Sequence, residues 1–298
     1  MVMTRSNFVD LLDPSFRKIF DEEYKRRPEY YSKLFHIENS TRQSEKLSQV
    51  TTLGLFAEKA EGSSISYDAI KQGYDVEAVH VTYALGFRVT REALDDDQFS
   101  ILKQKPKALA LSAKETVEVL SWSLINNGFN SAYTFGDGKE LFATDHPSPH
   151  GITGRNELST AADLSATSLR QAIQDIESTT CERGLPLALR ADVLMVPPAL
   201  EWTAKELLKS SQDPESANNT INPLYNRGLS LFVNPYLTDD DAWFLVDSTQ
   251  HKLFFFWRKQ LEMNSDYDYN TGDALYSAYM RFSRTAGDWR GIFGSPGA

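Results

Sequence analysis

A strict alternation of apolar and polar positions predicts a long strand near residue 80. Every second residue from 79 to 89 is apolar or aromatic, and the residues between them are small or polar; the apolar set is Val79, Val81, Tyr83, Leu85, Phe87 and Val89. This alternation indicates a strand with one buried face. Residues 40–75 show no helical period and contain Gly54, Gly62 and Gly73. They predict an extended excursion that turns near Glu61–Ser66.

Two segments have helical spacing instead. Residues from about 106 to 127 repeat apolar positions at steps of three and four: Leu109, Ala113, Val117, Leu120 and Leu124. They predict a long helix with one apolar stripe. Near the start, Asp13-Pro14 is a typical helix opening, and apolar residues follow at the same spacing. The pattern leaves two places for that apolar face: the body of its own chain, or a neighbouring subunit.

The second half of the chain alternates helices and strands, which predicts an α+β fold. A helix is expected around 169–176, and short apolar strands at 193–196, 231–233, 243–246, 253–257 and 276–282. The segment 165–250 is expected to form a lobe of its own. A polar loop, Ser210–Asn219, interrupts this lobe.

Charge and cysteine content narrow the function classes. The chain has 31 Lys and Arg against 41 Asp and Glu, a formal net charge of -10. Tight binding of nucleic acid through phosphate neutralisation needs clustered basic residues, so this balance argues against it. Cys181 is the only cysteine, which rules out an intrachain disulfide and any metal motif built on cysteines. No apolar run approaches the ~20 residues that span a bilayer, so we expect no membrane association.

The best candidate for a catalytic or metal site is the sequence TDHPSPH, which contains Asp145, His146 and His150. Asp and His side chains bind zinc and other divalent ions. Two prolines separate the histidines, however, so their spacing does not place them on one helical face. We therefore expect these residues to belong to a turn, and we expect no catalytic, cofactor-binding or metal residues. A metal-dependent hydrolase remains as an alternative from a different class.

Several ordered blocks of sequence resemble the phage major capsid proteins with the Hong Kong 97 fold, including relatives of the Mu-like major head subunit. The blocks cover about residues 50–298 and include LFATDHPSPHG at 141–151, GLPLALRADVLMVPPALEWTAKELL at 184–208, VNPYLTDDDAWFLVD at 233–247, DYDYNTGDALYSAY at 266–279 and DWRGIFGSPG at 288–297.

The resemblance implies a division of the chain into the parts of that fold. These are an N-terminal arm at 1–48, an extension loop at 49–92, a peripheral domain at 93–164 with a spine helix at about 106–127, an axial domain at 165–250, and a return to the peripheral domain at 251–298. Ser210–Asn219 is then expected near the axis of a capsomer.

The resemblance also implies a function. The chain is expected to assemble into pentamers and hexamers that form an icosahedral shell around double-stranded DNA, which it contacts non-specifically. The expected partners are further copies of itself, a separate scaffolding protein, a portal and a decoration protein. The expected location is the virion, with assembly in the host cytoplasm. An encapsulin-like shell that packages protein cargo is the alternative within the same fold. The expected assembly residues lie in the arm and the loop: Phe16, Phe20, Tyr24, Lys59, Ile65, Tyr67 and Tyr74.

Overall fold

The computed structural model describes residues 9–90, 92–93, 102–212 and 221–298, which form two compact units. The first unit contains residues up to 45 together with 79–121 and 255–284. The second contains residues 46–78, 122–254 and 285–298. Each unit therefore combines segments that are distant in the sequence. Within the described residues, no helix has both the length and the apolarity needed to cross a lipid bilayer.

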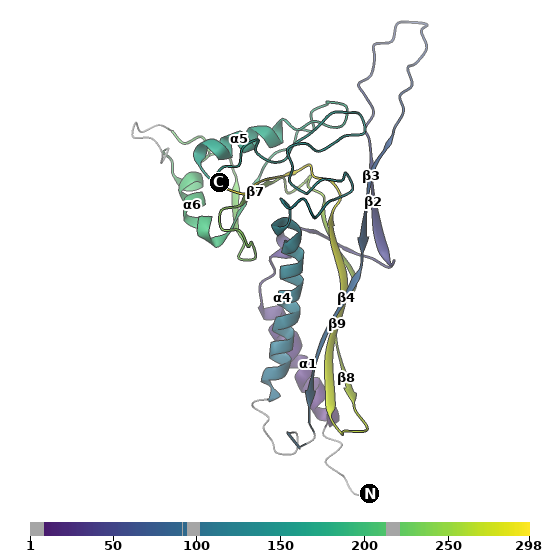
Figure 1. Cartoon of the computed structure of the whole chain (residues 1–298), viewed down its shortest axis with the longest axis vertical. Coiled ribbons are helices and arrows are strands. Elements are labelled where there is room, and N and C mark those ends of the chain that lie inside the picture. Colours follow the sequence, from purple (N-terminus) through teal and green to yellow (C-terminus); the bar gives the residue numbers. More distant parts are fainter. Residues whose placement is uncertain (1–8, 91, 94–101, 213–220) are drawn as a thin grey trace. The chain divides into compact units, whose positions relative to one another are not determined.

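A four-stranded sheet in the order β1-β8-β9-β4 is the main layer of the first unit (Figure 1). Its strands are β1 His36–Asn39, β4 Val81–Val89, β8 Leu253–Tyr267 and β9 Ala274–Ala286. Strand β4 is antiparallel to β9, with Val81 opposite Phe282 and Val89 opposite Ala274. A Cβ atom on Gly86 would lie 2.6 Å from the carbonyl oxygen of Tyr276. Only glycine allows the two strands to approach this closely.

Helices α1 (Val9–Arg26) and α4 (Gln104–Asn126) pack on the sheet of the first unit. Phe16 and Phe20 of α1 are 0% and 2% exposed. The ring of Phe16 meets that of Tyr276 on β9 edge to face, with 5.2 Å between centroids. The sequence left open whether the apolar face of this helix packs on its own chain or on a neighbouring subunit. In the structure it packs on its own chain. The long helix predicted at about 106–127 is observed as α4.

A buried carboxylate fixes the turn that follows α1. Glu118 on α4 is 0% exposed, and its two oxygens accept hydrogen bonds from the amides of Tyr30 and Tyr31 at 2.8 and 3.0 Å. These amides lie at the start of the 3₁₀ helix η2, Tyr31–Lys33. One turn earlier on α4, the buried Lys114 pairs with Glu29 at 2.5 Å and lies over the ring of Tyr24. Burial raises the pKa of the Tyr24 hydroxyl to about 12, with Glu29 and Glu118 adding to the shift.

The second unit contains another four-stranded sheet, in the order β10-β7-β5-β6. Its strands are β5 Val193–Val196, β6 Ser230–Val233, β7 Trp243–Val246 and β10 Ile292–Ser295. The accompanying helices are α5 Ala166–Glu177, η3 Pro198–Leu200 and α6 Glu201–Lys209. Ser165 and Ser168 form a reciprocal capping box that starts α5. The apolar faces of both α-helices and the sheet share one core, which includes Leu169, Leu194, Leu207, Trp243 and Phe293. The α+β fold class predicted from the sequence is confirmed.

A two-stranded ribbon, β2 Ser44–Val50 with β3 Gln72–Val79, belongs largely to the second unit. The strand that the alternation predicted over 79–89 is interrupted at His80, because β3 ends at Val79 and β4 starts at Val81. The amide of His80 donates to the carbonyl of Gln43 instead of continuing either ladder. One continuous pattern in the sequence therefore serves two different sheets.

We expect Glu118→Ala to lower the free energy of unfolding by about 3 kcal/mol, because it leaves the amides of Tyr30 and Tyr31 without their acceptor inside the protein. Glu118→Gln retains an acceptor oxygen and should cost less. Urea denaturation followed by circular dichroism measures both values. Glu115→Ala, at a half-buried position on the same helix, is the control and should change stability by about 0.5 kcal/mol or less. Equal effects of Glu118→Ala and Glu115→Ala would contradict this account.

Candidate functional site: assembly surfaces

The segment that joins β2 to β3 exposes large apolar side chains. Phe56 is 102% exposed and Tyr67 is 92% exposed. Other exposed apolar residues of the segment are Leu53, Leu55, Ile65 and Ile70. We call this set, with Phe56 and Tyr67, the loop apolar surface. Burying one such side chain is worth about 1.5–3 kcal/mol. Exposed apolar patches are common at protein–protein binding sites, so this segment is the candidate assembly surface.

The base of this segment is held to the second unit by Arg183. Its guanidinium pairs with the carboxylate of Asp68 at 3.0 Å through two of its nitrogens and donates to the carbonyls of Thr52 and Ala69 at 2.9 Å. The amide of Gly54 also donates to Asp68, at 2.9 Å. This amide is the main cause of the lowered pKa of Asp68, and Arg183 contributes to it. Both ends of the segment are thus fixed at one point, which we call the Arg183 clamp.

The ribbon below the clamp is anchored as well. Gln49 on β2 donates to Glu182 at 2.9 Å and to Asp288 at 3.3 Å. Across the ribbon, Lys46 pairs with Asp75 at 2.7 Å. Hydrogen bonding to Lys46 is the largest of the causes that lower the pKa of Asp75 to about 2. These contacts orient the ribbon and leave the loop apolar surface uncovered.

The structure separates the residues that the sequence nominated for assembly. Phe16 and Phe20 are core residues of their own chain, and Tyr24 is half-buried under Lys114. Tyr74 is half-buried and lines a small cavity in the second unit. The residues that remain exposed on the loop are Lys59, Ile65 and Tyr67.

Sequence reasoning missed Leu55 and Phe56, which are 81% and 102% exposed. The available signal was a pair of large apolar residues in GLF, inside a stretch without the periodicity of a helix or strand. It also missed the exposed Val81 and Leu85 on β4. Their alternation indicated a buried face, but on β4 the side chains of Val81 and Leu85 are 47% and 56% exposed.

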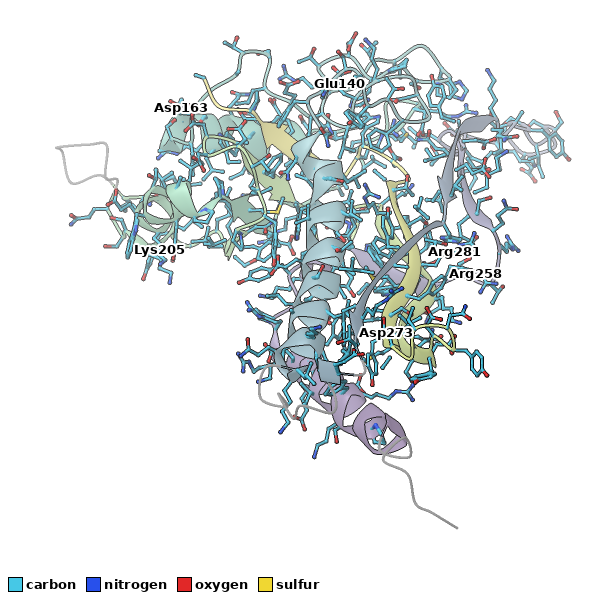
Figure 2. All side chains as sticks on the ribbon, turned by 60° about the horizontal axis from the view of Figure 1, so that its bottom comes forward. Glu140, Asp163, Lys205, Arg258, Asp273 and Arg281 are labelled. Atoms are coloured by element: carbon cyan, nitrogen blue, oxygen red, sulfur yellow. The ribbon has the colours of Figure 1, made fainter. Side chains whose placement is uncertain are left out.

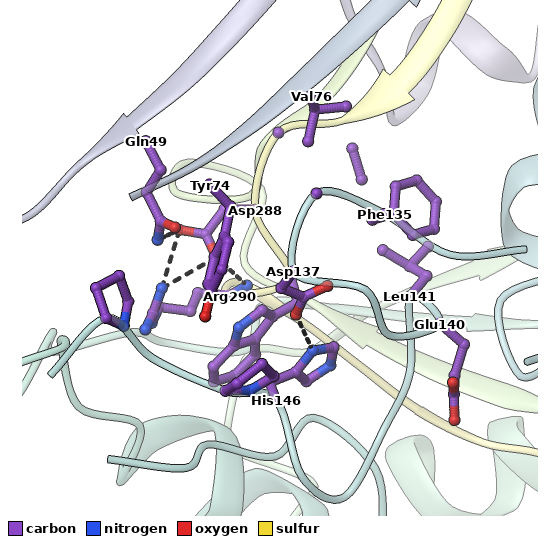
Figure 3. Close-up of a pocket in the computed structure, with 16 residues that line it drawn as sticks. Gln49, Tyr74, Val76, Phe135, Asp137, Glu140, Leu141, His146, Asp288 and Arg290 are labelled. Atoms are coloured by element: carbon purple, nitrogen blue, oxygen red, sulfur yellow. Dashed lines mark hydrogen bonds and ion pairs between the residues drawn. The ribbon is translucent and has the colours of Figure 1, made fainter. Parts of the chain in front are cut away.

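The pocket that contains His146 is structural (Figure 3). His146 is 1% exposed, and its Nδ1 lies 2.7 Å from Asp137 while its Nε2 lies 3.0 Å from Oδ1 of Asn156. The ring stacks on Trp289 with 4.6 Å between centroids. The cavity beside it measures about 30 Å³, which is room for a few water molecules and too little for a substrate.

The other members of the candidate metal set have different surroundings. Asp145 pairs with Lys139 at 2.6 Å, while the buried Nε2 of His150 has no hydrogen-bond partner among the described residues. Across the described ranges, His, Cys, Asp and Glu side chains do not gather in threes as a metal site. The contacts of Asp145 and His146 hold the turn together, which is the role expected for them from the prolines.

His80 forms a buried network where β3 gives way to β4. Its Nδ1 lies 2.9 Å from Ser283 Oγ, and its Nε2 lies 2.9 Å from Ser40 Oγ. Ser40 donates its own proton to Glu45 at 2.6 Å, so it accepts from Nε2–H of His80. In the neutral ring with this tautomer, Nδ1 accepts from the hydroxyl of Ser283. Burial lowers the pKa of His80, Arg281 and Arg258 add to the shift, and Glu45 opposes it; both arginines lie on neighbouring strands of the sheet (Figure 2).

An anchored ribbon that presents apolar side chains outward is the geometry of a protein that associates with other chains. Residues 73–294 match the family model described as phage capsid protein. The match spans most of the chain, which therefore belongs to the phage capsid protein family. No match was found among curated proteins.

Solved structures share the fold at low sequence identity. The bacteriophage JBD30 capsid is 16% identical with a TM-score of 0.57, covering 71% of this chain and 92% of its own. The capsid of cyanophage P-SCSP1u is 9% identical with a TM-score of 0.58, covering 91% and 89%. A virus-like particle from Pyrococcus furiosus is 11% identical with a TM-score of 0.54, covering 95% and 98%.

Family membership confirms the prediction, from the sequence resemblance, of a phage major capsid protein. The chain is a structural component of the virion capsid and not an enzyme. The family match favours this function over both the hydrolase and the encapsulin-like shell.

We expect the thermal stability of the protein to fall as the pH is lowered below about 6.5, the usual pKa of histidine. Because the pKa of His80 is lowered in the folded state, the unfolded chain binds the extra proton first, and stability is lost down to the folded pKa. His80→Gln supplies an uncharged donor and acceptor and should make the melting temperature less dependent on pH between 7.5 and 5.5. If the melting temperature of this variant changed with pH as much as that of the parent protein, His80 would be excluded as the cause of the pH dependence. His36→Gln, at a half-buried position, is the matched control.

Proposed function

We propose that this chain is the repeating subunit of a tailed-phage head, in which pentamers and hexamers tile an icosahedral shell. The observation that supports this most directly is the loop apolar surface. A two-stranded ribbon is marginally stable in water unless another element covers it. In a closed shell, every subunit has neighbours at fixed positions that cover it.

We assign the parts of the chain as the sequence resemblance implies. Residues 1–48 are the arm and 49–92 the extension loop. Residues 93–164 and 251–298 make the peripheral domain, with α4 as its spine helix, and 165–250 make the axial domain. The ribbon β2–β3 with its exposed tip supports the loop assignment, although β4 pairs in the sheet of the first unit. Of Ser210–Asn219, placed at the capsomer axis by this assignment, residues 213–219 lie outside the described part of the chain.

Other components of the head follow from the same proposal. A separate scaffolding protein directs assembly in the host cytoplasm, a portal occupies one vertex, and a decoration protein binds outside. The JBD30 capsid has been described both as a procapsid and as a capsid decorated with minor capsid protein trimers, which supports the expectation of such stages. The net charge of -10 fits loose containment of DNA, because contacts with phosphate need basic clusters.

Electron microscopy of the purified protein, expressed alone and together with the scaffolding protein, tests this function. Closed particles of uniform size with five- and six-fold capsomers are the expected result. Failure to form any particle in both preparations would overturn the proposal. Particles from infected cells that contain a protein cargo in place of DNA would favour the encapsulin-like alternative.

We expect Phe56→Asp and Tyr67→Asp to block assembly without destabilising the free subunit. Both side chains are almost fully exposed in the single chain, so their loss should leave its melting temperature unchanged. In the shell, each substitution removes about 1.5–3 kcal/mol at every contact and buries a charge. Sizing chromatography and microscopy should then show free subunits or capsomers in place of particles.

Ser64→Asp is the matched control, because it adds the same charge to an exposed position of the same segment and removes no apolar group. It should assemble. Normal particles from both apolar variants would show that the loop apolar surface is not an assembly contact.

A further inference from the structure

Strand β4 forms one edge of the sheet in the first unit and lacks the features that usually protect such an edge. Its only neighbour among the described strands is β9 (Figure 1). The strand has nine residues, VTYALGFRV, with no proline and no lysine. Its one charged residue, Arg88, pairs with Asp273 beside β9. Soluble proteins usually shield an edge with prolines, lysines or bulges, because an open edge accepts a further strand from another chain.

The backbone groups that point away from β9 belong to alternate residues of β4. In an antiparallel pair, residues that bond to the partner strand alternate with residues whose N–H and C=O groups point outward. The amide of His80 donates to the carbonyl of Gln43, outside the sheet. The carbonyl of Arg88 accepts from Nζ of Lys105. These two residues have the same parity, so the outward groups between them belong to Thr82, Ala84 and Gly86.

This outward row is open in the single chain. All three of its residues are exposed, and no other described residue forms a hydrogen bond with their backbone groups. Two large apolar side chains of the same strand, Val81 and Leu85, are exposed as well. A strand added at this edge would therefore bond to the row and cover apolar surface in one step.

Strand β4 is complementary to a second copy of itself around Ala84. An antiparallel pair centred there places small residues opposite small residues on one face and large apolar residues opposite each other on the other face, which is favourable across a sheet. Arg88 lies beyond the paired residues, so no charges of equal sign meet. The opposed pairs are Ala84 with Ala84, Thr82 with Gly86, Tyr83 with Leu85, and Val81 with Phe87.

The arms of the loop between β2 and β3 fit this edge less well. The first arm carries Leu55 and Phe56 at adjacent positions, so it lacks the alternation that a strand with one apolar face needs. The second arm alternates only over Ser64–Tyr67 before Asp68, which the Arg183 clamp holds. Neither arm therefore offers an alternating segment as long as β4.

We propose that β4 of one subunit pairs antiparallel with β4 of a second copy across a two-fold axis at Ala84. This contact rests on the proposed shell, because an icosahedral shell has two-fold axes between neighbouring capsomers, and it specifies the strand that meets its copy there. The contact is isologous, since both subunits contribute the same residues. It joins two four-stranded sheets into one and is separate from the loop apolar surface.

Disulfide formation in assembled particles tests this contact. Ala84→Cys places two thiols opposite each other at the axis, where Cα atoms about 5.5 Å apart allow a disulfide. Oxidation should give covalent dimers and no larger species on non-reducing gels. Ser277→Cys is the matched control, because Ser277 is exposed on the same face but lies one strand in from the edge, opposite Gly86. Neither this control nor the parent protein, whose only cysteine is the buried Cys181, should give a dimer.

Particles of Ala84→Cys that form no dimer would overturn the proposal, as would a dimer equally strong with Ser277→Cys. A ladder of larger oligomers from Ala84→Cys combined with Ser66→Cys, a position exposed on the loop, would assign the edge to the loop of a neighbour and would also overturn it. Failure of the proposed function gives a different result, because the parent protein then forms no particles.

Ala84→Lys gives a second, independent measurement. Ala84 is exposed, so the melting temperature of the free subunit should not change. In the shell, two lysines directly opposite each other should weaken each contact about fivefold and lower the yield of particles. Ser277→Lys, which adds the same charge away from the edge, should assemble normally. Equal yields from Ala84→Lys and Ser277→Lys would contradict pairing at Ala84.

Discussion

Large apolar side chains on an extended segment have no core of their own to enter, and this constraint governs the rest of the molecule. Between Thr51 and Lys71 the chain forms neither helix nor strand, so it cannot bury Phe56 or Tyr67 by folding back on itself. Each exposed ring costs free energy in water until another surface covers it. The anchored ribbon and the Arg183 clamp fix the base of this segment, and its apolar side chains stay available for contact with another surface. A shell subunit depends on neighbours in this way, whereas an independent monomer does not.

The spacing of apolar residues predicted the helices and strands better than it predicted which of their side chains are buried. The helix at Gln104–Asn126 and the short strands of the second unit follow directly from apolar spacing. Phe16 and Phe56 show the limit of that approach. Both are phenylalanines near the start of the chain, yet one is 0% and the other 102% exposed. Helical spacing gives Phe16 a face to share with α4 and β9, while Phe56 has no periodic neighbours. Whether a face packs within its own chain is decided by distant residues such as Tyr276.

The spacing of apolar positions could not predict which polar residues are buried inside the first unit. Glu118 and His80 look like surface residues in a sequence, and both are buried. Each is tolerated because partners from distant segments satisfy it: backbone amides for Glu118, and two serine hydroxyls for His80. The break in the strand at His80 has the same origin, since its partners Ser40 and Ser283 come from opposite ends of the chain. The resemblance to a capsid family supplied the fold plan, but it could not identify these contacts.

The Arg183 clamp fixes the base of the loop, so a small rotation at the base would displace the distant tip. Thr52 and Asp68 meet at the clamp, so the tip near Gly62 is separated from it by several residues of extended chain, or roughly 20 Å at about 3.3 Å per residue. A rotation of about 10° at the base would then move the tip by roughly 3–4 Å, close to the rise of one residue along a strand. A shell that joins five-fold and six-fold rings must accommodate small changes of angle between subunits. Because the guanidinium of Arg183 bonds to both arms of the loop, a small rotation there would shift the tip sideways by about the rise of one residue.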